Sequence, residues 1–124
     1  MTSNILQVTP FMHVPDLEAA LAFMTGILGF SVGFRQSNYA YVSREGAGLR
    51  ILEVGGDPSP PATHRFAYYF DCRDVDSLHA ELKPKLDLLP AEDVHGPADK
   101  PYRQRELLVK APDGNLIVFG QSIA

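Results

Sequence analysis

The strongest constraint on the fold is an order of secondary-structure patterns that occurs twice, on either side of one linker. Residues 55–65 form this linker, and their three prolines and two glycines oppose both a helix and regular strand pairing. Residues 5–54 before it and residues 66–121 after it each predict a strand, a helix and three further strands. Each half is too short to bury a good core alone. We therefore expect one domain over residues 1–124, in which two modules pack together or against a second copy of the chain.

In the first module, alternating side chains over residues 5–15 predict a strand, and Pro10 within it indicates a sheet edge or a change of pairing partner. Asp16 follows as a helix N-cap, because its carboxylate can accept hydrogen bonds from amides of the first turn. Apolar residues at helical spacing come next, and Gly29 suits the left-handed conformation that ends many helices. Three short strands are expected at residues 31–35, 38–43 and 49–54.

The second module repeats this order. Residues 66–73 predict a strand, and either Asp74 or Asp76 caps a helix whose extent Pro84 limits. Three more strands are expected at residues 86–95, 105–111 and 116–121, with a tight turn over residues 112–115 joining the last two. The fold class is therefore α+β.

Composition narrows the partners. The chain has 11 Lys and Arg against 15 Asp and Glu, a net charge of −4, which disfavours nucleic acid and anionic membranes and is compatible with a cationic ligand. No apolar run approaches the roughly 20 residues of a membrane span, and the N-terminus has no signal-peptide pattern. A single cysteine cannot form an internal disulfide. We expect a cytoplasmic protein.

Several short motifs occur in one order along nearly the whole chain. They are Val14-Pro15-Asp16-Leu17, Ala22-Phe23, Leu28-Gly29-Phe30, Phe70-Asp71-Cys72-Arg73-Asp74-Val75, Arg105-Glu106 and Ala111-Pro112-Asp113-Gly114-Asn115. In this order they resemble the vicinal oxygen chelate superfamily of glyoxalases, bleomycin resistance proteins and extradiol dioxygenases. Gly96-Pro97 and Pro101-Tyr102 are most similar to the bleomycin resistance branch.

The resemblance implies two tandem βαβββ modules whose mixed sheets curl around a cavity. In the enzymes of the superfamily, His and Glu side chains hold a divalent metal in that cavity. In the bleomycin resistance branch there is no metal, and a homodimer sequesters the drug in clefts shared between the subunits. Because one fold hosts these different activities, the residues of the site must decide between them.

The positions that hold the metal in the resembled enzymes can be located in this chain. Three of them are occupied by Thr9, Ala67 and Val118, and the fourth falls on the strand at residues 49–54, where Glu53 is the only candidate. A divalent ion needs three or four converging nitrogen or oxygen donors. We therefore expect no metal at this position and no cofactor.

The expected ligand-binding residues are aromatic side chains that would border the cavity, together with two polar side chains. They are Phe11, Phe34, Tyr39, Tyr41, Tyr69 and Tyr102, with His13 and Arg105. Aromatic rings offer flat, rigid contact area, and core packing is the alternative for some of them. His13 is either a ligand contact or a strand-end histidine, and an ion pair explains Arg105 equally well.

Taken together, these features favour a metal-independent protein that sequesters a drug-like or natural-product ligand, possibly cationic, in clefts of a homodimer. No catalytic residue is assigned. The alternative is a glyoxalase-like or dioxygenase-like enzyme with an atypical or relocated active site, and a subunit with a vestigial cavity is a third reading. Exchange of the N-terminal strand between subunits is compatible with Pro10 but is left open.

Overall fold

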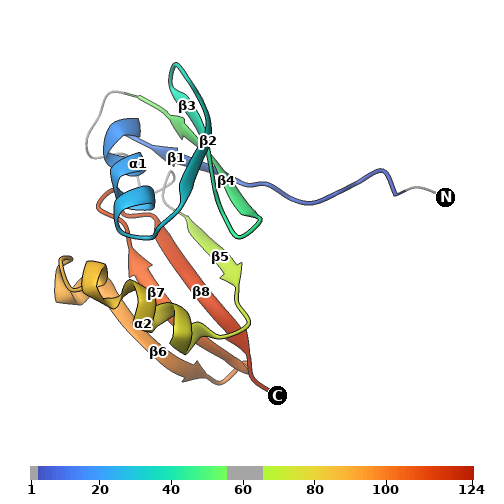
Figure 1. The fold of residues 1–124 in the computed structure, drawn as a ribbon, viewed down its shortest axis with the longest axis vertical. Coiled ribbons are helices and arrows are strands. Elements are labelled where there is room, and N and C mark those ends of the chain that lie inside the picture. Colours follow the sequence, from blue (N-terminus) through green and yellow to red (C-terminus); the bar gives the residue numbers. More distant parts are fainter. Residues whose placement is uncertain (1–2, 56–65) are drawn as a thin grey trace.

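The computed structural model describes residues 3–55 and 66–124, so most of the predicted linker lies outside the described residues. It contains two four-stranded sheets (Figure 1). The first sheet comprises β1 (Phe11–Val14), β2 (Ser31–Gln36), β3 (Tyr39–Arg44) and β4 (Ala47–Glu53), with helix α1 (Leu17–Gly26). The second comprises β5 (Ala67–Asp71), β6 (Val94–Lys100), β7 (Gln104–Lys110) and β8 (Leu116–Ser122), with helix α2 (Val75–Leu86) and the short 3-10 helix η2 (Ala91–Asp93).

The two sheets have the same topology, which confirms the α+β class and the tandem βαβββ modules. Their strand orders are β1-β4-β3-β2 and β5-β8-β7-β6. In each sheet the first pair, β1 with β4 or β5 with β8, is parallel, and the other pairs are antiparallel. Neither helix in this part of the chain is long and apolar enough to cross a membrane.

The modules also repeat the way in which each helix begins. The side chain of Asp16 accepts a hydrogen bond from the amide of Ala19, and that of Asp74 accepts one from Ser77. A second acceptor comes from the last strand of each module. In the first module it is the carboxylate of Glu53, 2.8 Å from the amide nitrogen of Leu17. In the second it is the side-chain Oε1 of Gln121, 2.9 Å from the amide nitrogen of Val75. Of the two candidate caps for α2, Asp74 is therefore the one used.

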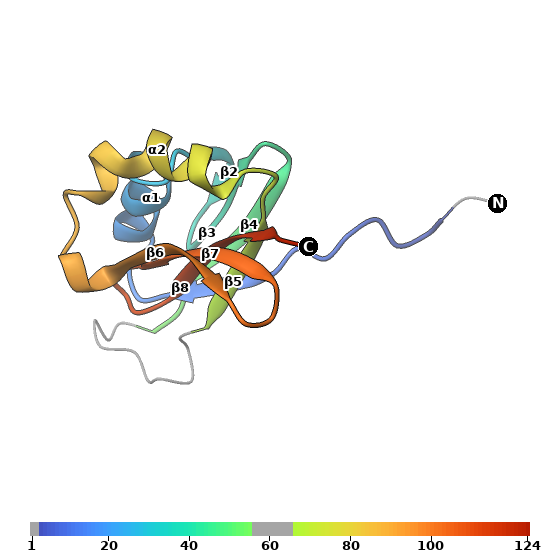
Figure 2. The same ribbon diagram turned by 90° about the horizontal axis from the view of Figure 1, so that it is seen from below.

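Two sequence predictions differ from the structure. The first strand begins at Phe11, and residues 3–10 run as an extended arm away from the body of the molecule (Figures 1 and 2). Ile5, Leu6 and Val8 in this arm are almost fully exposed, because none of the strands within residues 3–55 and 66–124 pairs with it. Helix α2 continues past Pro84 to Leu86, whose buried side chain packs its last turn into the core, and the following strand starts only at Val94.

One hydrophobic core serves both modules. On β3 and β7, alternate side chains point into it: Ala40 and Val42 on β3, and Leu107 and Val109 on β7. Asn115, almost fully buried, links the modules by accepting a hydrogen bond from the amide of Phe66 and donating one to the carbonyl of His13. The core covers one face of each sheet. The side chains that alternate with the core residues lie on the opposite face.

Candidate functional site

The first sheet presents an aromatic surface on the face opposite the core. The burial pattern of β1 and β3 places Phe11, His13, Tyr39 and Tyr41 there, each alternating with a buried residue. Tyr39 lies between two other rings, with centroids 6.2 Å from that of Phe11 and 6.1 Å from that of Phe34. We call this surface the first aromatic face; it comprises Phe11, His13, Phe34, Tyr39, Tyr41 and Arg50.

Sequence reasoning did not identify Arg50, which lies beside Phe11 in the register of β1 and β4. Its guanidinium carbon is 6.0 Å from the centroid of the Phe11 ring, within the range of a cation–π contact, and Nη1 donates a hydrogen bond of 2.9 Å to the Tyr39 hydroxyl. The first aromatic face therefore combines flat rings with one positive charge. The strand register was the only signal that could have indicated this residue.

The second sheet presents a smaller polar and aromatic surface on its corresponding face. Alternation along β7 turns Gln104 and Glu106 to this face and Leu107 and Val109 to the core. Tyr69 and Tyr102 lie over them with large parts of their rings exposed. The Tyr69 hydroxyl donates a hydrogen bond of 2.9 Å to Gln104 Oε1. We call Tyr69, Tyr102, Gln104 and Glu106 the second aromatic face.

Glu106 is the buried centre of the second aromatic face, with only 4% of its surface exposed. The Tyr102 hydroxyl donates a hydrogen bond of 2.6 Å to its Oε1. This bond to a carboxylate is the main cause that raises the pKa of Tyr102, while burial and then the neighbouring Glu106 carboxylate raise that of Tyr69. Both phenols therefore remain neutral donors near pH 7. Glu106 was not among the residues predicted from the sequence.

Two tyrosines lie flat against glycines of neighbouring strands, one in each sheet. A Cβ atom at Gly48 would come 2.2 Å from the hydroxyl oxygen of Tyr41, and a Cβ at Gly120 would come 1.8 Å from that of Tyr69. Real Cβ atoms do not approach this closely, so only glycine leaves room for either ring. Each tyrosine thus offers a flat ring surface on the face of its sheet.

Arg105 does not join the other predicted residues. It alternates with Glu106 and lies on the core side of β7, where its guanidinium pairs with Asp76 of α2 at 2.9 Å and with Asp99 of β6 at 3.0 Å. These two carboxylates raise the pKa of Arg105. The ion-pair reading of this residue therefore accounts for its position, and it is left out of both faces.

The residues at the expected metal positions do not form a ligand set. Thr9 belongs to the N-terminal arm, and Ala67 and Val118 carry no donor. Glu53 uses its carboxylate to accept the hydrogen bond from the first amide of α1. Over residues 3–55 and 66–124, no three His, Cys, Asp or Glu side chains are grouped so that they could hold a metal ion. The donors in this part of the chain therefore do not fit the metal of the resembled enzymes.

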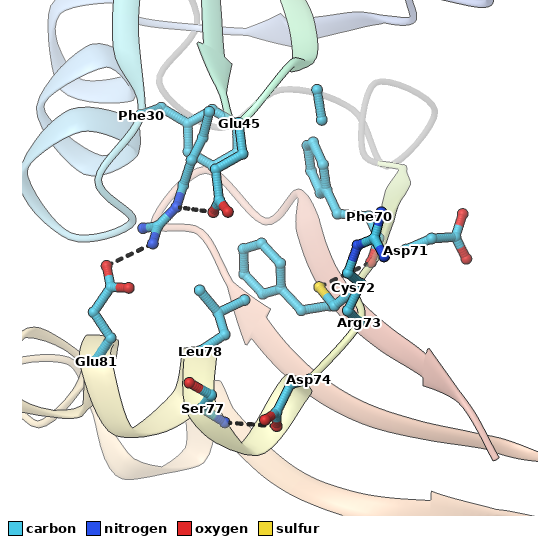
Figure 3. Close-up of a pocket in the computed structure, with 13 residues that line it drawn as sticks. Phe30, Glu45, Phe70, Asp71, Cys72, Arg73, Asp74, Ser77, Leu78 and Glu81 are labelled. Atoms are coloured by element: carbon cyan, nitrogen blue, oxygen red, sulfur yellow. Dashed lines mark hydrogen bonds and ion pairs between the residues drawn. The ribbon is translucent and has the colours of Figure 1, made fainter.

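A separate cavity of about 380 Å³ lies between the two modules on the helix side (Figure 3). Phe30 and Phe70 form part of its wall, and their ring centroids are 5.3 Å apart. Arg44 spans the modules there, donating to the carbonyl of Leu28 at 2.8 Å and to the carboxylate of Glu81 at 2.5 Å. None of the eight predicted ligand-binding residues lines this cavity.

Cys72 also lines the cavity between the modules. Its thiol lies 3.6 Å from the carbonyl oxygen of Phe70, and burial raises its pKa. A thiol with a raised pKa holds little thiolate at neutral pH and is a poor nucleophile. This cavity consequently fits a role in joining the modules better than a role in catalysis.

Comparison with known proteins agrees with this architecture. Residues 5–119 match the family model described as Glyoxalase/Bleomycin resistance protein/Dioxygenase superfamily. Among solved structures, the chain is similar to a bleomycin-binding protein from Streptomyces verticillus complexed with copper(II)-bleomycin, at 22% identity over 99% of each chain and a TM-score of 0.77.

Two further solved structures show how widely this fold is used. One is a bleomycin resistance determinant encoded on the transposon Tn5, at 21% identity over 95% of this chain and 98% of that chain, with a TM-score of 0.73. The other is a lactoylglutathione lyase from Agrobacterium tumefaciens, at 15% identity over 96% of each chain, with a TM-score of 0.70. A search of curated proteins finds no match.

Proposed function

The chain belongs to the glyoxalase/bleomycin resistance protein/dioxygenase superfamily, and within it we propose that this protein binds a drug-like or natural-product molecule without a metal. The main supporting observation is the pair of aromatic faces, in which the side chains of Phe11, Phe34, Tyr69 and Tyr102 are about half exposed to solvent. Flat, rigid rings with hydroxyl tips are well suited to stacking on a planar ligand and fixing its polar groups.

Binding without catalysis is supported by the donor set. Thr9, Ala67 and Val118 stand where the resembled enzymes hold their metal, and Glu53 is engaged at the start of α1. The polar groups of the second aromatic face are hydrogen-bonded to one another, which suits recognition of a ligand. The ligand is therefore sequestered intact, in the cytoplasm, before it reaches its target.

The binding clefts belong to a homodimer in this proposal. Each aromatic face is open on its outer side, and a second chain would supply the opposite wall. The N-terminal arm supports the same assembly, because Ile5, Leu6 and Val8 place apolar side chains in solvent at a distance from the core. Such segments are buried when another chain covers them. We infer that the arm packs on the partner subunit.

Isothermal titration calorimetry with bleomycin tests the proposed function. The protein is first treated with a chelator, and metal-free bleomycin and copper(II)-bleomycin are then titrated separately. The expected result is saturable binding of both forms at one site per protomer. Phe34→Ala should weaken binding, because it removes a ring of the first aromatic face, whereas Leu88→Ala removes a similarly exposed apolar side chain elsewhere and should leave binding unchanged.

A set of other planar natural products is titrated in the same way, so that the outcome does not depend on bleomycin alone. Absence of binding to every member, or binding that returns only when a divalent metal is added back, would overturn the proposal.

Light scattering at micromolar concentration tests the assembly. A dimer mass is expected, and the combined substitutions Ile5→Ser, Leu6→Ser and Val8→Ser should shift the population toward monomer. A monomer mass for the unaltered chain would contradict the shared clefts.

A further inference from the structure

We infer that the carboxylate of Glu106 selects ligands that carry a cationic group, which it receives between the rings of Tyr69 and Tyr102. This inference rests on the proposed function and specifies the chemistry of that ligand. It assigns one end of the ligand to the second aromatic face and gives a defined role to a side chain that was not among the ligand-binding residues expected from the sequence.

Glu106 is a buried acid that forms no ion pair within the described part of the chain. Only 4% of its surface is exposed, and the donor to its carboxylate is the neutral hydroxyl of Tyr102. Among the described residues, no Lys, Arg or His side chain forms an ion pair with it. Removing a carboxylate from water is costly unless a positive charge compensates it. A cationic ligand would supply that charge.

The surroundings of Glu106 favour a cation over a neutral group. Tyr69 and Tyr102 expose ring surface beside it, and the negative face of an aromatic ring attracts positive charge. Asp71 adds a second negative charge close enough to raise the pKa of Tyr69. The nearest charged residue of β7, Arg105, points to the other side of the sheet and is already paired with two carboxylates.

The first aromatic face has the opposite polarity. Arg50 lies over Phe11 there and would repel a cation, while its rings remain available for stacking. The two faces together therefore suit a molecule with a planar aromatic body and a positive group at one end. The planar body stacks on the first face, and the positive group reaches the second.

A pair of matched dyes tests this inference without knowledge of the natural ligand. Thioflavin T is a planar benzothiazolium cation, and its demethylated benzothiazole analogue has nearly the same shape without the charge. Both are titrated by calorimetry into the wild-type protein, into Glu106→Gln and into Glu92→Gln. Glutamine at position 106 keeps the side-chain shape and an acceptor for Tyr102, and Glu92→Gln removes the same charge from an exposed site on η2.

The wild-type protein should bind the cation about tenfold more tightly than the neutral dye, as expected for a charge-assisted contact with aromatic neighbours. Glu106→Gln should abolish this preference, so that the ratio of the two affinities falls to about one, and Glu92→Gln should retain it. An equal affinity for the two dyes in the wild type, or a preference that survives Glu106→Gln, would overturn the inference alone. If neither dye nor bleomycin binds to the wild type, the proposed function fails and the inference fails with it.

Discussion

The glycine beneath Tyr69 offers a quantitative test of the second aromatic face. In Gly120→Ala, the new Cβ would lie 1.8 Å from the Tyr69 hydroxyl oxygen, 2.3 Å from Cζ and 2.6 Å from Cε1. A contact with three ring atoms cannot be relieved by turning the hydroxyl, so the whole ring must leave its place. Its hydrogen bond to Gln104 is then lost, at a cost of about 0.5–1.5 kcal/mol.

The displaced ring also loses its packing on the sheet, which adds about 1 kcal/mol for a half-exposed aromatic side chain. Alanine has a lower conformational entropy than glycine in the unfolded chain, and this offsets roughly 0.5–1 kcal/mol. The free energy of unfolding should therefore fall by about 0.5–2 kcal/mol, which lowers Tm by roughly 2–10 °C in a domain of this size. Urea unfolding followed by circular dichroism measures the change.

Two controls separate this mechanism from a general effect of the substitution. Gly26→Ala has no atom within 4 Å of the new Cβ and should stabilise the protein by about 0.5–1 kcal/mol. In a Tyr69→Ala background the cost of Gly120→Ala should disappear, because no ring remains to be displaced. If Gly120→Ala costs the same with and without Tyr69, or costs nothing in the wild type, the ring does not lie where we describe it.

Three other substitutions test two contacts that join the modules and one ion pair within the second module. Asn115→Ala removes the hydrogen bonds to the partly buried amide of Phe66 and carbonyl of His13 and should cost about 1–3 kcal/mol in urea unfolding. A cost below about 1 kcal/mol would mean that water or a neighbour replaces the amide. Arg44→Ala should destabilise the protein by about 1–3 kcal/mol, because it leaves a half-buried carbonyl without its donor and breaks the bridge to α2, and unaltered stability would contradict that role. Arg105 lowers the pKa of Asp76, so the stabilisation from this pair is present above the unfolded pKa of about 3.9 and is lost as the pH falls through the lower folded value. Asp76→Asn should accordingly be less stable than the wild type at pH 7, and the difference should shrink as the pH falls below about 4 in urea titrations. A difference that does not change with pH would contradict this origin.

Much of the fold could be predicted because it follows from local patterns. Asp16 and Asp74 are placed by the capping preference of aspartate, and the alternation of Tyr39 and Tyr41 with Ala40 and Val42 shows which side of β3 is buried. These patterns depend on neighbours in the sequence. They also placed five of the six aromatic candidates on strands, since alternation assigns a strand residue to a face.

Other features depend on contacts between distant segments. Arg105 and Glu106 are adjacent in the sequence, and a shift of one residue in strand register exchanges their faces. The pairing of β7 with β8 is what places Glu106 on the second aromatic face and Arg105 on the opposite side of the sheet. The N-terminal arm is a similar case. Its apolar alternation predicts a strand, but a strand needs a neighbour, and no strand in the part of the chain that the structure describes pairs with residues 3–10.

The measurement that tests our central claim most directly is an amide NMR titration with metal-free bleomycin in the presence of a chelator. We expect saturable changes in the chemical shifts of the amides around Phe11, Tyr41, Tyr69 and Glu106 on the aromatic faces. The chemical shifts of the amides of Cys72 and of helices α1 and α2 should not change. Shifts concentrated around the cavity between the modules, or the absence of any saturable change, would contradict ligand binding at the aromatic faces.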